Sequence, residues 1–179
     1  MISGAPFQEA AITVRPAVPK DAGKLRELRL AALAAHPEAF AMDAESVATE
    51  TVAQWAERIT RNISTGTGTI CVAAVGDQLI GMMGLYRDLR PKTRHSGTIW
   101  GAYVDVAWRG RHVAEGLMGE CLAWAREQGL VVVKLGVITP NTPAIRCYAR
   151  CGFTIYGIEP KVIHCNGVFY DELLLARQI

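Results

Sequence analysis

Two arginines flank a glycine in the turn Arg109-Gly110-Arg111, which joins a predicted strand to a predicted helix. At the start of a helix several backbone N–H groups lack intrahelical partners and the helix dipole is positive, so a phosphate or pyrophosphate is favoured there. An ordinary basic turn between a strand and a helix explains these residues equally well. The turn has neither the GxxxxGK[ST] spacing of a P-loop nor the GxGxxG spacing of a dinucleotide fingerprint.

A second polar segment begins at Asn141 and runs to Phe153. It opens a short helix after an apolar run and places Tyr148 two turns into that helix. Such a tyrosine usually packs half-buried with its hydroxyl at the surface. The segment indicates a reaction only when it is considered together with the first turn.

The spacing of apolar residues predicts both helices and strands around these two segments. Apolar residues at helical spacing predict a helix capped by Asp21 and ended by His36-Pro37, and a second helix capped by Thr51 with Gln54 at the capping-box position. Apolar runs predict strands, and the turn pairs Gly76-Asp77 and Asn166-Gly167 mark hairpins. The predicted strands are 12–18, 69–75, 78–86, 98–106, 131–138, 153–162 and 168–176.

The strand that ends near Val106, the helix that ends at Gly129 and the strand 131–138 form one βαβ unit. Its two strands should therefore run parallel, with a right-handed crossover. Thr142 is the expected N-cap of the next helix, with Pro143 in its first position. The whole order predicts a mixed α/β sheet with helices on both faces.

The composition of the 179 residues excludes several classes of protein. With 50% hydrophobic and 20% charged residues, the chain should fold as one globular domain. A net charge of +2 gives no reason to expect nucleic acid or a membrane as a partner. Five cysteines without a CxxC pair predict reduced thiols and no metal site. No signal-peptide pattern is visible and no apolar run reaches the roughly 20 residues of a membrane helix, so a cytoplasmic protein is expected.

Together, the two polar segments resemble those of the GNAT superfamily of N-acetyltransferases. In that family a [QR]-x-x-G-x-[GA] turn binds the pyrophosphate of acetyl-CoA, and the matching residues here are Arg109, Gly110, Arg111, His112, Val113 and Ala114. The family's N-x-x-A-x-x-x-Y-x-x-x-G-F segment is matched by Asn141, Ala144, Tyr148, Gly152 and Phe153. The resemblance covers nearly the whole chain, from the opening at Ile12 to the closing segment at Tyr170.

The resemblance implies a single-domain GNAT-like fold over residues 11–179, after an N-terminal extension at residues 1–10. The sheet is expected to be mixed and mostly antiparallel, with about seven strands and one parallel βαβ unit. The pantetheine arm of acetyl-CoA would enter a gap between strands 98–106 and 131–138. The implied cofactor-binding residues are Ala102, Tyr103, Val104, Arg109, Gly110, Arg111, His112, Val113, Ala114, Glu115 and Asn141.

Two positions depart from the family pattern. His112 stands where the family has the first turn glycine, and Val106 stands where a proline is common. Glycine allows the backbone to approach the pyrophosphate closely. The His112 side chain could turn outward, contact phosphate itself, or weaken cofactor binding, and the sequence leaves these three outcomes open.

The reaction that the resemblance implies is direct transfer of acetyl to an amine. A backbone N–H near Val104 would polarise the thioester carbonyl. Tyr148, with an ordinary pKa of about 10, would be the general acid that protonates a thiolate with a pKa of about 8.5. The strand 98–106 lacks the glutamate that the family often uses as a base. Asp105, His95 and Asp88 are then candidates, and a chain of water molecules is favoured over each of them.

The acceptor implied by the resemblance is a primary amine of a small molecule or of a protein. The basic loop from Arg87 to His95 would suit an acidic acceptor or contact the 3′-phosphate of CoA, but a solvated hairpin loop is favoured over both. A homodimer is compatible with the family. The alternative function is a non-catalytic module that binds acetyl-CoA and regulates a partner. An unrelated α/β domain that merely shares the pattern is the third hypothesis.

Overall fold

The computed structural model describes residues 11–179, so the predicted N-terminal extension at 1–10 lies outside the described residues. Within this range seven strands form one sheet: β1 (Ile12–Pro16), β2 (Gly68–Val75), β3 (Gln78–Arg87), β4 (Ser96–Val104), β5 (Val132–Ile138), β6 (Thr154–Cys165) and β7 (Val168–Gln178). The same range holds the α-helices α1 (Ala22–Ala35), α2 (Ala44–Thr49), α3 (Val52–Thr65), α4 (Val113–Glu127) and α5 (Thr142–Arg150). Short 3-10 helices lie at η1 (Pro19–Asp21), η2 (Pro37–Ala39) and η3 (Val106–Trp108).

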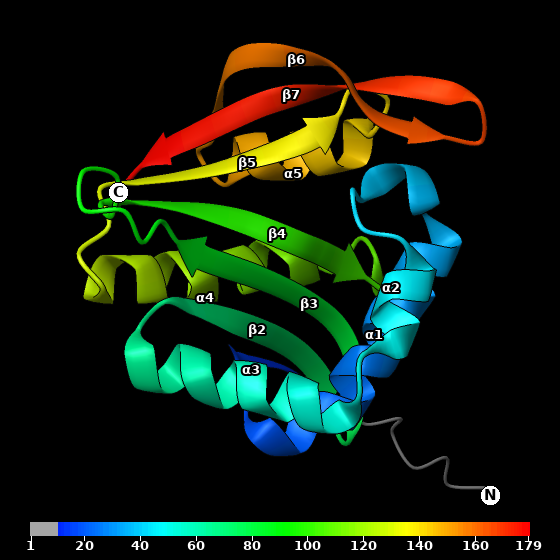
Figure 1. Cartoon of the computed structure of the whole chain (residues 1–179), viewed down its shortest axis with the longest axis vertical. Helices are drawn as coiled ribbons and strands as arrows, with labels where there is room; N and C mark the ends of the chain where they lie inside the picture. Colours follow the sequence, from blue (N-terminus) through cyan, green and yellow to red (C-terminus); the bar gives the residue numbers. More distant parts are fainter. Residues whose placement is uncertain (1–10) are drawn as a thin grey trace, which may run out of the picture.

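The strand order in the sheet is β1-β2-β3-β4-β5-β7-β6 (Figure 1). β4 and β5 run parallel, whereas every other neighbouring pair is antiparallel. The parallel pair is connected through α4, which is the βαβ unit predicted from the sequence. The predicted mixed, mostly antiparallel sheet of about seven strands is therefore confirmed.

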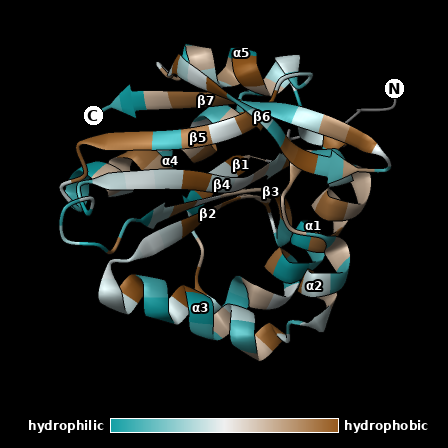
Figure 2. Ribbon diagram, turned by 45° about the horizontal axis from the view of Figure 1, so that its top comes forward, coloured by the Kyte–Doolittle hydropathy of each residue, from teal (hydrophilic) through white to brown (hydrophobic). Residues whose placement is uncertain are grey.

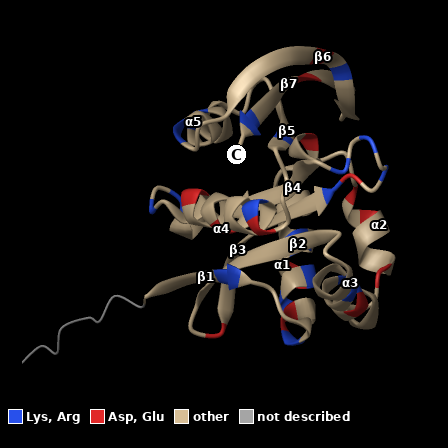
Figure 3. Ribbon diagram, turned by 90° about the vertical axis from the view of Figure 1, so that its left-hand side faces the viewer, with Lys and Arg blue, Asp and Glu red and all other residues tan. Residues whose placement is uncertain are grey.

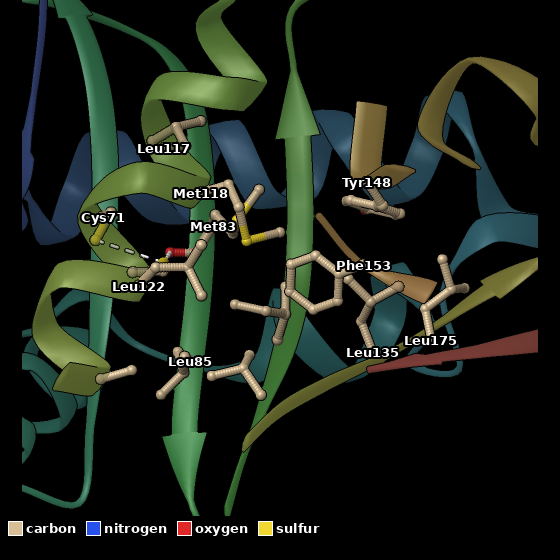
Figure 4. Close-up of a cluster of buried hydrophobic side chains, with 14 of the residues drawn as sticks. Cys71, Met83, Leu85, Leu117, Met118, Leu122, Leu135, Tyr148, Phe153 and Leu175 are labelled. Atoms are coloured by element: carbon tan, nitrogen blue, oxygen red, sulfur yellow. Dashed lines mark hydrogen bonds between the residues drawn. The ribbon is translucent and has the colours of Figure 1, made fainter. Parts of the chain in front are cut away.

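Helices cover both faces of the sheet, as predicted. α1 and α3 pack on one face of β2 and β3, while α4 packs on the other face and α5 lies beside β5 and β7 (Figures 1 and 2). One core fills the α4 side, and Figure 4 shows Leu117 and Met118 there with Tyr148 and Phe153. A second core, which includes the fully buried Trp55, fills the α1 side.

Charged side chains lie mainly on the helices and on the loop after β3, and the central strands carry few of them (Figure 3). This distribution follows from burial, because the strands in the middle of the sheet are covered on both faces. None of the helices in the described part of the chain is long and apolar enough to cross a membrane.

Asp21 is the N-cap residue of α1, as predicted, but its side chain makes no capping hydrogen bond to that helix. Its carboxylate instead accepts hydrogen bonds of 2.6 and 2.9 Å from Arg15 and one of 2.8 Å from the N–H of Val18. The hydrogen bonds from Arg15 hold the pKa of Asp21 below its ordinary value. The carboxylate thus joins β1 to the start of α1.

Two other local predictions shift by one or two residues. β4 ends at Val104 rather than Val106, because Asp105 accepts a 2.9 Å hydrogen bond from the N–H of Ala107 and starts η3. The N-cap of α5 is Asn141 rather than Thr142. The capping box of Thr51 and Gln54 at the start of α3 is confirmed.

Candidate active site

β4 and β5 pair only at their beginnings. Ser96 to Thr98 lie opposite Val132 to Lys134, and no pairing joins the later residues of the two strands. Figure 1 shows the strands moving apart toward η2 and α1. The predicted gap between these two strands is therefore confirmed.

A cavity of about 100 Å³ lies in this gap. Its walls are residues 99–102 of β4 and 135–138 of β5. Asn141, Ala144 and Tyr148 close it from α5, while Ala39 and Phe40 close it from the end of η2. The cavity thus brings together segments that are up to about a hundred residues apart in the sequence.

The β4 wall contains a β-bulge. Met82 pairs with Tyr103 and Gly84 pairs with Trp100, so Gly101 and Ala102 together lie opposite Met83. Gly101 has φ +62°, a conformation that glycine adopts without the cost paid by other residues. Bulges redirect the backbone and often lie beside active sites. Here the bulge lies in the strand that lines the cavity.

Tyr148 lies at the α5 side of this cavity. Its side chain is only 8% exposed, and its ring lies 6.4 Å from that of Phe153, centroid to centroid (Figure 4). Burial, together with the nearby Cys147 and Cys151, raises the pKa of the Tyr148 hydroxyl. The phenol therefore keeps its proton at neutral pH, as a proton donor must.

Asn141 begins α5 at the cavity. Its Oδ1 atom accepts a 3.3 Å hydrogen bond from the N–H of Ala144. This contact orders the first turn of the helix that carries Tyr148. The predicted contact of Asn141 with the cofactor stays a prediction.

The turn before α4 has two residues in the left-handed region, Gly110 with φ +78° and His112 with φ +57°. The His112 side chain is 81% exposed, and its Nδ1 atom lies 3.3 Å from the carboxylate of Glu115. The His112 side chain is thus turned outward, and its effect on cofactor binding stays a prediction. Ala114 follows in the first turn of α4, while Val113 is buried in the core.

Glu115 places a carboxylate in the first turn of α4. Arg150 of α5 donates hydrogen bonds of 3.1 and 2.6 Å to it. Burial raises the pKa of Glu115, but hydrogen bonds from Arg150, from the backbone and from His112 together outweigh this effect, and the net pKa is lowered. The ion pair with Arg150 partly neutralises the carboxylate of Glu115 and links α4 to α5.

Arg109 turns back toward the end of β4. Its Nε atom donates a 3.1 Å hydrogen bond to the carbonyl of Val104, and its Nη2 atom lies 2.9 Å from Nε2 of His36. Its guanidinium also lies 5.9 Å from the ring centre of Tyr103. Arg111 lies over the indole of Trp108, at 5.1 Å from the ring centre. Arg109 therefore contacts two other predicted cofactor-binding residues, Tyr103 and Val104, at the end of β4.

The candidate bases from the sequence do not line the cavity. Asp88 is held by Arg90, which donates hydrogen bonds of 3.1 and 2.7 Å and lowers the pKa of the carboxyl. Asp105 caps η3, and the carbonyl of His95 accepts from the N–H of Val131. The structure therefore gives the side chains of Asp88 and Asp105 structural roles.

Glu172 was missed by the sequence reasoning and lies against the cavity wall. It stands on β7 opposite Ile138, and its carboxylate occupies the space where a Cβ on Gly136 would lie. Burial, and then the charge of Glu159, raises the pKa of Glu172. The only signal in the sequence was an acidic residue directly before the apolar run 173–175.

The chain matches the model of the acetyltransferase (GNAT) family over residues 28–153. It is 33% identical over 110 residues to the L-amino acid N-acetyltransferase AaaT of Escherichia coli K12, a match that spans 59% of this chain and 65% of that protein. It is 39% identical over 56 residues to an Escherichia coli streptothricin acetyltransferase, spanning 31% of this chain and 32% of the relative.

Solved structures share the fold over 94% of this chain. The acetyltransferase of GNAT family from Streptococcus pneumoniae superposes with a TM-score of 0.85, at 23% identity and over 100% of that chain. The structure of yncA from Salmonella typhimurium with its cofactor acetyl-CoA superposes with a TM-score of 0.82, at 20% identity and over 94% of that chain.

Proposed function

The chain belongs to the acetyltransferase (GNAT) family, and we propose that it transfers the acetyl group of acetyl-CoA to a primary amine. The observation that carries the proposal is the cavity between the unpaired parts of β4 and β5, with Tyr148 at its α5 side. An amine and a thioester that meet in such a cavity would react without a covalent enzyme intermediate. The reaction class is direct acyl transfer.

The described residues fit acetyl-CoA in two respects. The inner edge of β4 from Ala102 to Val104 has backbone groups without a strand partner on the β5 side, where an extended amide chain can bind. The turn from Gly110 to Glu115 offers the start of α4, with Arg109 and Arg111 beside it, to a pyrophosphate. When bound, acetyl-CoA supplies an activated acetyl thioester.

Proton transfers are the chemistry that the chain's own side chains would perform. The amine must lose a proton as the new C–N bond forms, and the thiolate released when the C–S bond breaks must gain one. We assign the second proton to the hydroxyl of Tyr148, which burial keeps protonated. Glu172, whose side chain lies against Gly136 of the cavity wall, is the proposed acceptor of the first, directly or through water.

The relatives support a small-molecule acceptor. The names of two of them state an L-amino acid and streptothricin as the substrates. The cavity is also small, which suits an amine on a compact molecule. An amino group of a protein remains the second candidate acceptor.

A thiol-release assay with acetyl-CoA and a panel of amines tests the proposal. We expect CoA to be released in proportion to acetylated amine, confirmed by mass spectrometry of the product. Acetyl-CoA binding without turnover on any amine would instead support the regulatory-module hypothesis. Failure to bind acetyl-CoA would overturn both hypotheses.

A further inference from the structure

Arg29 is a buried arginine with an unsatisfied nitrogen. It lies on α1 and is only 5% exposed. Its Nη1 atom is buried and has no hydrogen-bond partner within the described residues. Burial lowers the pKa of this guanidinium to about 10, and the charge of Glu50 offsets only part of that effect.

The neighbouring arginines have partners. Arg26, one turn earlier on α1, donates hydrogen bonds of 2.6 and 2.8 Å to the carbonyls of Glu50 and Ala48. The carboxylate of Glu50 accepts from Arg58. A buried charge without a partner is costly, whereas a buried guanidinium that meets an anion is stabilised. The orphaned Nη1 of Arg29 therefore points to an anion that arrives from outside the chain.

The position of Arg29 connects it to the cavity. Its guanidinium lies 4.4 Å from the ring centre of Phe40, and its Nη1 lies 3.5 Å from where a Cβ on Gly101 would be. Phe40 and Gly101 both line the cavity. Arg29 thus lies directly behind the cavity wall, and the partly exposed Phe40 ring packs against its guanidinium.

Opposite charges therefore stand behind two walls of the same cavity. Arg29 is positive behind Gly101 of β4, and Glu172 is negative against Gly136 of β5. At Gly136 the absence of a Cβ makes room for the carboxylate of Glu172, whereas Nη1 of Arg29 lies at van der Waals distance from where a Cβ on Gly101 would be. A ligand that carries a cationic amine and an anionic group a few bonds apart matches this arrangement.

We propose that the acceptor is an amino acid or a close analogue, and that Arg29 binds its carboxylate. The assignment rests on the proposed acetyltransferase function and names its substrate class. The carboxylate satisfies Nη1 of Arg29 and leaves the amine on the β5 side, next to Glu172. Arg29 is then a specificity-determining residue for acids over uncharged amines.

The test compares L-methionine, L-leucine and L-phenylalanine with their primary amides. Each pair keeps the same amine and side chain but differs in the carboxylate. We expect the protein to prefer the acids by at least about tenfold in kcat/KM, which corresponds to about 1.4 kcal/mol. The amine of an amide is less basic and more often neutral at pH 7, so the comparison is biased against the expected result.

The variant Arg29→Met should abolish the preference for acids. It should raise KM for the acids and leave KM for the amides unchanged. Because it removes a buried unpaired charge, its midpoint of chemical denaturation should be unchanged or higher. Arg26→Met is the matched control on the same helix. It loses two structural hydrogen bonds, so its stability should fall while the acid-to-amide ratio stays as in the unmodified protein.

Other outcomes separate the inference from the proposed function. Equal turnover of acids and amides would overturn the role of Arg29 and leave the acetyltransferase intact. If no amine is acetylated, the same acids and amides can be titrated calorimetrically into the CoA-bound protein. Tighter binding of the acids would support the carboxylate site, and equal binding would overturn it. Equal loss of stability and of both activities in Arg29→Met would show a merely structural arginine.

Discussion

At the residue scale, Tyr148 combines two properties that a proton donor needs, a place beside the reacting groups and a firmly held proton. It lines the cavity, and burial raises the pKa of its hydroxyl. A raised pKa also makes the phenol a weaker acid, so its contribution must come from its position beside the sulfur rather than from its acidity.

Replacing Tyr148 by Phe should lower kcat by about 100-fold or more, because general acids typically contribute this much. The affinity for acetyl-CoA should be unchanged, since the ring remains. Steady-state kinetics and a binding titration check both values. Tyr156→Phe on β6, a tyrosine that is 56% exposed, is the control and should keep full activity. An unchanged kcat in Tyr148→Phe would remove the hydroxyl from the mechanism.

The raised pKa of Glu172 should affect activity and stability in opposite directions as the pH rises. Its pKa is raised by burial and by Glu159. As a proton acceptor it must be ionised, so kcat/KM should rise as the pH rises through this raised pKa, and Glu172→Gln should lose that rise. Rate profiles between pH 5 and 9 measure the effect, and a profile unchanged in the variant would exclude Glu172 as the base.

The stability effect follows from the same shift. The folded protein binds the Glu172 proton more tightly than the unfolded chain, so this stabilisation is present at low pH and is lost as the pH rises through the folded pKa. At neutral pH, Glu172→Gln should therefore be at least as stable as the unmodified protein. Urea denaturation at pH 5 and pH 7.5 checks this prediction.

At the scale of elements, the sequence predicted what depends on local patterns. The strands, the hairpin turns and the βαβ unit follow from apolar period and turn residues, and all were confirmed. Arg29 and Glu172 were missed, because the relevant partners lie on other elements that only the folded topology brings near. Arg29 did leave one signal, since it stands four residues after Leu25 and four before Leu33 on the apolar face of α1.

The start of α4 offers a test of backbone strain. His112 adopts a left-handed conformation that costs a residue other than glycine about 1 kcal/mol. His112→Gly should therefore raise the free energy of unfolding by about 1 kcal/mol without weakening acetyl-CoA binding. Gly110→Ala is the opposite change, because Gly110 has φ +78°. This variant should lower the free energy of unfolding by a similar amount. Lower stability of His112→Gly would mean that the contact with Glu115 outweighs the strain.

At the scale of the whole molecule, the sheet consists of two parts joined over a short seam. β1 to β4 form one part, and β5, β7 and β6 form the other. Only the beginnings of β4 and β5 hold them together within the sheet, while α4 and the core beneath it connect them across one face. The resemblance predicted this gap, and the structure shows that Phe40 closes its far side.

Binding of acetyl-CoA should protect the gap selectively. Backbone amides of residues 99–104 and 135–138 should exchange hydrogen more slowly with the ligand, whereas β2 and β3 should change little. At a ligand concentration 100 times the dissociation constant, the fold should gain about 2.7 kcal/mol. Hydrogen-exchange mass spectrometry and thermal denaturation measure these effects. Slower exchange confined to the region of α4 would place the ligand outside the gap.

The gap also gives the sheet two free edges in its interior. Exposed strand edges usually invite aggregation, but here η2, α5 and the two strands themselves enclose them. A ligand that pairs with such an edge is recognised through main-chain atoms, which every residue type possesses. The surrounding sequence is then free to diverge while the binding geometry persists. This freedom is consistent with a fold shared almost completely with a Streptococcus pneumoniae relative at 23% identity.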